Sequence, residues 1–223
     1  MTTKSRSSNT PLVVAGVVIL LLVLAVIAVL ATGGSSEDAD GTATDSRLPA
    51  LLRPEVRPIE VEGTPLPAYA PEGGDLALGM RPPLLVGEDT TGRVHTVSPD
   101  IEGSVLLVFL AHWCPACNQE VPVLVDLANA GAISPDLKVY AVLTAMEPGR
   151  PGFPPSRWLN DFAWPFETIM DEPDLDRGPW KAAEAFGLTS FPYIVAIKDG
   201  VVVDRWSGAS APEVLAARIA ASS

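Results

Sequence analysis

Two cysteines three residues apart offer the clearest chemistry in this sequence. Cys114 and Cys117 are the only cysteines among 223 residues, and they enclose the dipeptide Pro-Ala. With this spacing one thiolate can attack a disulfide, and the second thiol lies near enough to resolve the mixed disulfide that results. The pair therefore predicts thiol–disulfide exchange.

The position of Cys114 predicts which thiol attacks. The unbroken apolar run 105–110 before it indicates a strand that is covered on both faces, and apolar residues recur with helical spacing after it. A thiol at the start of a helix faces unpaired backbone N–H groups and the positive end of the helix dipole, which stabilise its thiolate. We expect Cys114 to be the more exposed, nucleophilic thiol and Cys117 to be the resolving thiol.

Two other interpretations of the cysteines stay open. A structural disulfide would make the protein a non-catalytic binding module, although a loop this short removes little entropy from the unfolded chain. Alternatively, His112, Cys114 and Cys117 could hold zinc or Cu(I) in a module that hands copper to another protein. Zinc normally takes four ligands, and the only other histidine is His95.

The elements that must position the cysteines predict an α/β sandwich with a mixed sheet. The patterns indicate a turn leading into a short edge strand over 91–97, and further strands at 105–110, 137–143, 193–198 and 201–206. Helices are indicated at about 115–130, 156–163, 179–186 and 211–220. Asp199 and Gly200 form a two-residue hairpin signal between the last two strands. Ser210 and Glu213 predict a capping box on the last helix.

An uncharged apolar run precedes all of these elements. It extends from Leu12 to Ala31, and 20 residues at about 1.5 Å each span the hydrocarbon core of a bilayer. Lys4 and Arg6 precede the run and acidic residues follow it, so the positive-inside rule places the N-terminus in the cytoplasm. A signal peptide cleaved after Ala31 is the alternative, but the apolar part of such a peptide usually has only about 7–15 residues.

Composition divides the chain into four parts. We expect a cytoplasmic tail at 1–10, one transmembrane helix at 11–31, an extracytoplasmic linker at 32–74 and a folded domain at 75–223. The linker is rich in proline, glycine and acidic residues, which bury too little apolar area to offset the entropy of the chain. The net charge of −12 argues against nucleic acid as a partner, because such binding needs Lys and Arg.

The segment 106–122 resembles the redox site of thioredoxin-fold proteins, and more narrowly that of membrane-anchored thioredoxin-like reductases of the TlpA/ResA type. In that family a glutamate follows the first cysteine by six residues, and Glu120 stands there in this sequence. A proline before a late strand forms a cis peptide bond beside the cysteines in thioredoxin folds, and its preceding backbone pairs with substrate. Pro192, which follows Phe191, matches that proline.

The resemblance implies a thioredoxin-like domain over 75–223 that acts as an extracytoplasmic thiol–disulfide oxidoreductase. The implied catalytic residues are Cys114, Cys117, Pro192 and Glu120, with Glu120 exchanging protons with Cys117, and Trp113 and Phe191 border the substrate. The implied partners are extracytoplasmic protein disulfides and thiols, for example in cytochrome c maturation, and a membrane thiol carrier that supplies electrons. No cofactor is expected beyond the disulfide between the two cysteines.

The surroundings of the cysteine pair supply further candidates. Loops at the carboxyl ends of strands surround the site in open α/β sheets, which makes Met146, Glu147 and Phe153 candidates for contacts with a partner. We expect His112 to be a surface residue; the alternative is that a protonated His112 adds positive charge near Cys114.

Overall fold

The computed structural model describes residues 47–72 and 74–223. These residues belong to the second of two compact units, Thr42–Ser223. The predicted tail at 1–10 and the predicted transmembrane helix at 11–31 lie outside the described residues. Within the described ranges, no helix combines the length and the apolar composition that crossing a membrane requires.

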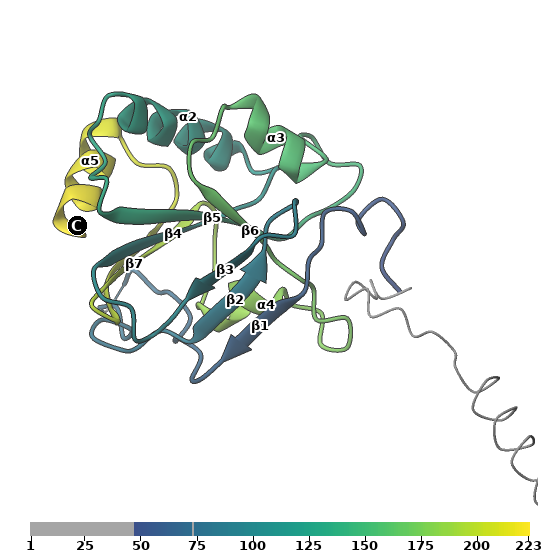
Figure 1. The fold of residues 1–223 in the computed structure, drawn as a ribbon, viewed down its shortest axis with the longest axis horizontal. Coiled ribbons are helices and arrows are strands. Elements are labelled where there is room, and N and C mark those ends of the chain that lie inside the picture. Colours follow the sequence, from purple (N-terminus) through teal and green to yellow (C-terminus); the bar gives the residue numbers. More distant parts are fainter. Residues whose placement is uncertain (1–46, 73) are drawn as a thin grey trace, which may run out of the picture. The chain divides into compact units, whose positions relative to one another are not determined.

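A five-stranded mixed sheet forms the centre of the folded unit (Figure 1). In spatial order its strands are β6 (Glu167–Met170), β5 (Leu137–Leu143), β4 (Ser104–Leu110), β7 (Tyr193–Lys198) and β8 (Val201–Ser207). The first three strands are parallel, and β7 and β8 are antiparallel to their neighbours. The predicted mixed sheet is confirmed, whereas β6 is a strand that the sequence patterns did not indicate.

Each face of this sheet is covered by a different layer (Figure 1). Helices α2 (Pro115–Asn129), α3 (Pro155–Asp161) and α5 (Pro212–Ala221) cover one face, and α4 (Lys181–Ala185) with a second sheet covers the other. Alternate residues of β4 serve the two cores: Leu106, Val108 and Leu110 pack with the α2 layer, and Val105, Leu107 and Phe109 pack on the other side. We call these two sides the α2 face and the opposite face.

The second sheet has three antiparallel strands, β1 (Ile59–Glu62), β2 (Leu84–Glu88) and β3 (Val94–Val97). The short edge strand predicted within 91–97 is confirmed as β3. The two sheets approach closely at Gly87 of β2, where an added Cβ atom would lie 2.7 Å from the side chain of Ile169 in β6. Only glycine fits at this contact without displacing its neighbour.

The described part of the predicted linker packs into the folded unit, so the linker interpretation of 32–74 is wrong for residues 47–72. Leu48, Leu52 and Val56 are buried in the core of the α2 face, and β1 pairs with β2 along its whole length. The carboxylate of Glu55 accepts hydrogen bonds from the backbone N–H and the hydroxyl of Ser156. The apolar residues of this segment are few, but a core supplied by the rest of the chain receives them.

The predicted hairpin between β7 and β8 is confirmed. Asp199 and Gly200 both have positive φ angles, 48° and 74°, as the tight turn that suits the twist of two antiparallel strands requires. An added Cβ atom on Gly200 would lie 2.2 Å from the carbonyl oxygen of Pro99. The capping box at Ser210 and Glu213 is absent, because α5 begins after Ala211 and no side chain caps it.

Candidate active site

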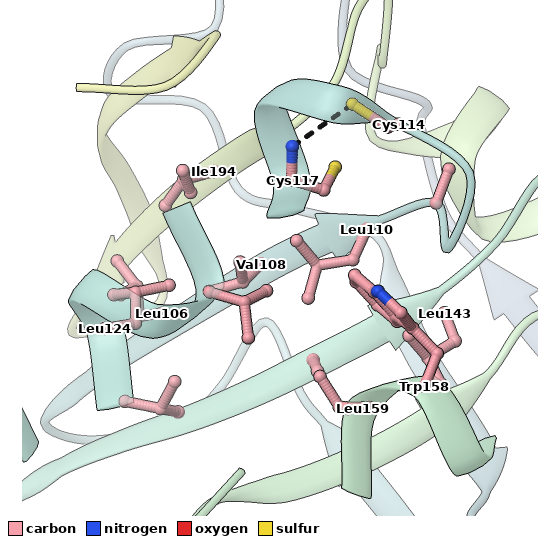
Figure 2. Close-up of a cluster of buried hydrophobic side chains, with 14 of the residues drawn as sticks. Leu106, Val108, Leu110, Cys114, Cys117, Leu124, Leu143, Trp158, Leu159 and Ile194 are labelled. Atoms are coloured by element: carbon pink, nitrogen blue, oxygen red, sulfur yellow. Dashed lines mark hydrogen bonds between the residues drawn. The ribbon is translucent and has the colours of Figure 1, made fainter. Parts of the chain in front are cut away.

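Cys114 caps helix α2 at its N-terminus. Its backbone is extended, Pro115 occupies the first turn, and the backbone N–H of Cys117 donates a hydrogen bond to the Cys114 sulfur at 3.3 Å (Figure 2). Both cysteines carry free thiols. Cys114 is 6% exposed and Cys117 is fully buried, so Cys114 is the more accessible of the two.

Cys117 points into apolar surroundings. Leu110, Val108 and Leu143 belong to the same cluster of buried side chains below it (Figure 2). Burial raises the pKa of the Cys117 thiol well above its ordinary value, and the neighbouring Cys114 and Glu120 add to this effect. The thiol therefore stays protonated unless a nearby group accepts its proton.

Glu120 lies two turns into α2 and is fully buried. One carboxylate oxygen, Oε2, accepts a hydrogen bond from the backbone N–H of Ser210 at 2.8 Å, and the other, Oε1, has no hydrogen-bond partner. Burial raises the pKa of Glu120, and the hydrogen bond from Ser210 opposes that rise only in part. The backbone N–H of Ser210 thus binds the Glu120 carboxylate, and Ser210 does not cap α5.

His112 is buried, so its predicted place at the surface is wrong. Its Nδ1 atom lies 2.8 Å from the carbonyl oxygen of Pro151, and its Nε2 atom accepts a hydrogen bond from the backbone N–H of Glu147. This pairing assigns the proton to Nδ1 and makes the ring neutral. Burial also lowers the pKa of His112, so the ring holds the loop after β5 in place and adds no positive charge near Cys114.

Trp113 forms one wall beside the cysteines. Its indole N–H donates a hydrogen bond to the carbonyl oxygen of Ala145 at 2.7 Å, and its ring meets the ring of Phe191 edge to face at 5.9 Å. The guanidinium group of Arg150 stacks over the indole, 4.6 Å from the ring centroid. Trp113 and Phe191, the two residues predicted to border the substrate, are thus in contact with each other.

The three loop residues chosen as partner contacts differ in accessibility. Met146 is buried, Phe153 is half-buried with its ring edge to face with His112, and Glu147 is exposed. Of these side chains, only that of Glu147 is fully open to a partner.

The predicted cis peptide bond between Phe191 and Pro192 is confirmed. It lies directly before β7, and the Pro192 carbonyl oxygen accepts a hydrogen bond from the backbone N–H of Gly208. A second cis bond joins Phe153 to Pro154, and no pattern in the sequence indicated it.

Comparison with solved structures shows a thioredoxin-like fold. The chain is similar to the thioredoxin domain of a thiol-disulfide oxidoreductase from Bacteroides vulgatus, with 19% identity, a TM-score of 0.52 and coverage of 66% of this chain and 98% of that one. A thiol:disulfide interchange protein, DsbE, from Chlorobium tepidum gives 22% identity, a TM-score of 0.53 and coverage of 66% and 99%. A thioredoxin family protein from Chlorobium tepidum TLS gives 17% identity and a TM-score of 0.50, with coverage of 72% of this chain and 98% of that one.

Comparisons at the sequence level add no relative. No family model matches the chain, and no curated protein matches it. The likeness is therefore one of fold, and the chemistry of the site is argued from the residues of this chain.

Proposed function

We propose that this protein is a thiol–disulfide oxidoreductase in which Cys114 attacks and Cys117 resolves. The observation that carries the proposal is the placement of the two sulfurs. Cys114 Sγ sits at the N-terminus of the 15-residue helix α2 and accepts a hydrogen bond from the N–H of Cys117. A hydrogen-bond donor and the helix dipole both favour a thiolate at that position.

The exchange proceeds in two successive displacements at sulfur. The Cys114 thiolate attacks one sulfur of a substrate disulfide, a mixed disulfide forms, and the other substrate sulfur leaves as a thiolate. The Cys117 thiol then loses its proton and attacks the Cys114 sulfur, which closes the Cys114–Cys117 disulfide and releases the second substrate sulfur. Two electrons pass to the substrate, whose sulfurs leave as thiols after taking up two protons.

Glu120 is the proposed acceptor for the proton of Cys117. The Cys117 thiol resists ionisation because it is buried, so the second displacement needs a base close to it. Glu120 is buried on the same helix, has one free carboxylate oxygen and, with a raised pKa, is a stronger base than an exposed glutamate. The negative charge of Glu120 raises the pKa of Cys117 further, so Cys117 and Glu120 are rarely ionised at the same time. A single proton that moves between the two groups keeps one of them neutral throughout.

The substrate is proposed to lie against Trp113, Phe191 and Pro192. The edge-to-face contact of the two aromatic rings joins the segment before β7 to the segment that carries the cysteines. In the thioredoxin-like reductases that this sequence resembles, backbone before the cis proline pairs with an extended substrate. If the backbone of Phe191 pairs with substrate in the same way, an extended protein segment that carries a disulfide would fit as the substrate.

The setting of the reaction is proposed from the sequence. The apolar run 12–31 would anchor the chain in the cell membrane, with the folded unit outside the cytoplasm. Electrons would come from a membrane thiol carrier, and the substrates would be extracytoplasmic protein disulfides, for example those formed during cytochrome c maturation. The exchange itself needs no metal, nucleotide or flavin.

A copper-handling module built on His112 and the two cysteines is less well supported. Both ring nitrogens of His112 are engaged by the backbone of the loop after β5. The ring would have to release Glu147 or Pro151 before it could bind a metal ion.

Trapping of the mixed disulfide tests the exchange. In membranes from cells that make the full chain, Cys117→Ala should leave Cys114 bonded to its partner, because no other cysteine can resolve the adduct. A non-reducing gel should show a higher band that dithiothreitol removes, and the Cys114→Ala variant should show none. The same absence of a band for Cys117→Ala, under conditions where the wild type reduces a disulfide, would contradict the proposal.

A further inference from the structure

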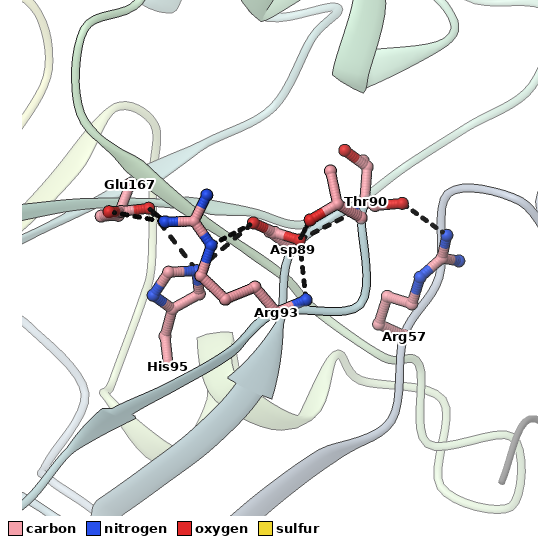
Figure 3. Close-up of polar contacts among 7 residues, drawn as sticks. Arg57, Asp89, Thr90, Arg93, His95 and Glu167 are labelled. Atoms are coloured by element: carbon pink, nitrogen blue, oxygen red, sulfur yellow. Dashed lines mark hydrogen bonds and ion pairs between the residues drawn. The ribbon is translucent and has the colours of Figure 1, made fainter.

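Three potential metal ligands converge on the opposite face, away from the cysteines (Figure 3). Asp89 directly follows β2, His95 lies in β3, and Glu167 is the first residue of β6. One ligand atom from each of the three lies within 4.8 Å of the other two. The cluster thus joins the three-stranded sheet to the edge of the five-stranded sheet.

The Nε2 atom of His95 is buried and has no hydrogen-bond partner. The residue is 7% exposed, and Nε2 lies 3.5 Å from Asp89 Oδ2 and 3.7 Å from Glu167 Oε2. These distances are too long for good hydrogen bonds. A buried ring nitrogen that faces two carboxylate oxygens without bonding to either is unusual, because buried polar atoms are normally paired.

Asp89 is held so that one of its oxygens remains available. Its Oδ1 atom accepts three hydrogen bonds, from the backbone N–H and the hydroxyl of Thr91 and from the backbone N–H of Arg93. These three hydrogen bonds fix the carboxylate group, and its Oδ2 atom lies 3.5 Å from His95 Nε2.

Arg93 covers the cluster from the solvent side. Its guanidinium group lies 3.2 Å from Glu167 Oε1, and its Nε atom lies 3.7 Å from Asp89 Oδ2. The Arg93 side chain is 63% exposed, so it can swing into solvent without uncovering a core. The guanidinium group supplies positive charge that an ion would replace.

We propose that Asp89, His95 and Glu167 form a binding site for a divalent first-row transition-metal ion such as zinc. The site offers one imidazole nitrogen and two carboxylate oxygens, and water can complete the shell on the side where Arg93 now lies. A tetrahedral zinc ion with bonds of about 2.0–2.2 Å places its ligand atoms about 3.4 Å apart, close to the observed separations from His95. The imidazole favours such an ion over calcium or magnesium, which prefer oxygen ligands alone.

The bound ion would fasten the two sheets together. Asp89 and His95 belong to the β2–β3 hairpin, and Glu167 opens β6, the strand whose Ile169 meets Gly87. A metal bond across this contact stabilises the folded chain by the free energy of binding, because the ligands are far apart in the unfolded chain. The site takes no part in the dithiol exchange and does not depend on it.

Zinc titration of a thiol-free protein tests the site. The parent is the untagged full chain in detergent with Cys114 and Cys117 both replaced by alanine, because free thiols would bind zinc themselves. Calorimetry should show one zinc ion per chain, and zinc should raise the melting temperature. Glu167→Gln should weaken binding by at least about 10-fold and remove most of the rise.

Two further variants separate a metal site from a simple cluster of charges. Arg93→Gln should strengthen zinc binding several-fold, because it removes the guanidinium group that competes for both carboxylates. His95→Gln should weaken zinc binding at least as much as Glu167→Gln does. If the substitution at the buried His95 prevents folding, Glu167→Gln still tests the site, because the Glu167 side chain is half-exposed. Glu213→Gln, at an exposed carboxylate of α5, should leave binding unchanged.

The opposite results would overturn the site. These are a parent protein that takes up no zinc at 0.1 mM, chosen as roughly 100 times a micromolar dissociation constant, or Glu167→Gln and Arg93→Gln variants that bind zinc as the parent does. The second result would place the ion on carboxylates elsewhere in the chain.

Discussion

Buried titratable groups beside the cysteines on the α2 face differ from the two partnered carboxylates Asp75 and Asp89 on the opposite face in the direction of their pKa shifts. On the α2 face, burial raises the pKa values of Cys117 and Glu120 and lowers that of His112, so all three groups favour their neutral forms. On the opposite face, the pKa values of Asp75 and Asp89 are lowered, so both carboxylates stay charged. The fully buried Asp171 lies on that face too, and there burial outweighs its hydrogen bonds and raises its pKa to about 6. The direction of each shift is therefore set by the depth and the partners of the group.

This contrast separates groups that can exchange protons from groups that hold the fold. An ionised group in apolar surroundings is costly, so Cys117 and Glu120 both favour their neutral forms, which suits the proton transfer proposed between them. Asp75 is instead paired with Arg205, whose side chain is fully buried and whose Nε atom lies 2.8 Å from Asp75 Oδ2. Such a pair resists a change in protonation and loses much when one partner is removed.

The largest expected effect is on the ion pair of the opposite face. Asp75→Asn should lower the free energy of unfolding by about 3–5 kcal/mol, because it leaves the buried Arg205 charge without a counter-ion. Urea unfolding at neutral pH measures the loss. Asp100→Asn is the matched control, because Asp100 pairs with Arg81 at the surface, where an ion pair contributes about 0–1 kcal/mol. Equal losses in the two variants would show that burial does not set the strength of these pairs.

Glu120→Gln tests the proton-exchanging group of the α2 face. The variant should resolve mixed disulfides about 100-fold more slowly, which is the usual contribution of one positioned base. Rapid-quench measurement of glutathione release from Cys114 follows that step, and Glu102→Gln at an exposed carboxylate should leave its rate unchanged.

Glu120→Gln should also change how stability depends on pH. Because the pKa of Glu120 is raised above its ordinary value of 4.5, folding is penalised as pH rises above that value. The variant should therefore gain stability over the wild type at pH 8 and lose that advantage near pH 4. A slow resolving step without the pH-dependent gain would mean that Glu120 acts by position and not as a base.

Replacing each histidine by phenylalanine compares the two faces directly. His112→Phe should cost about 1–3 kcal/mol of unfolding free energy, because it removes both hydrogen bonds of the buried His112 ring, to the Glu147 N–H and the Pro151 carbonyl oxygen. His95→Phe, measured with a chelator present, should cost less than about 1 kcal/mol, because His95 Nε2 makes no hydrogen bond. A larger loss for His95→Phe than for His112→Phe would contradict the conclusion that the hydrogen bonds of His112 stabilise the fold and that His95 contributes little without a metal ion.

The smallest expected effect concerns the start of α5. Glu213→Ala should change stability by less than about 0.5 kcal/mol, since the first turn of α5 has no side-chain cap. A loss near 1 kcal/mol, which is typical of a lost cap, would mean that Ser210 serves α5 and does not support Glu120. Urea unfolding of this exposed-site variant is sufficient to decide.

The sequence predicts the strands at the centre of the fold better than the elements around them. The runs 137–143 and 193–198 match β5 and β7 residue for residue, because both strands are mostly apolar and mostly buried. The strand β6 has only four residues and no such run, so its place depends on pairing with β5. The burial of the segment 47–72 was not predicted, because its few apolar residues are buried only by a core formed elsewhere in the chain.

The same distinction applies to the site. Cys114 and Cys117 are recognised because their chemistry depends on neighbours in the sequence. The hydrogen bonds of His112 reach residues 35 and 39 positions away, and Ser210 meets Glu120 across 90 positions. Contacts over such distances leave no local pattern, so the burial of His112 and the support of Glu120 become visible only in the folded chain.

The central claim is that Cys114, the more accessible thiol, attacks and that the fully buried Cys117 resolves. Mass spectrometry with oxidised glutathione tests it most directly. Under native conditions the Cys117→Ala variant should gain one glutathione, on Cys114. The Cys114→Ala variant should gain none until urea unfolds it, because Cys117 is fully buried and its raised pKa keeps it protonated. Equally rapid modification of both variants in the folded state would contradict the account.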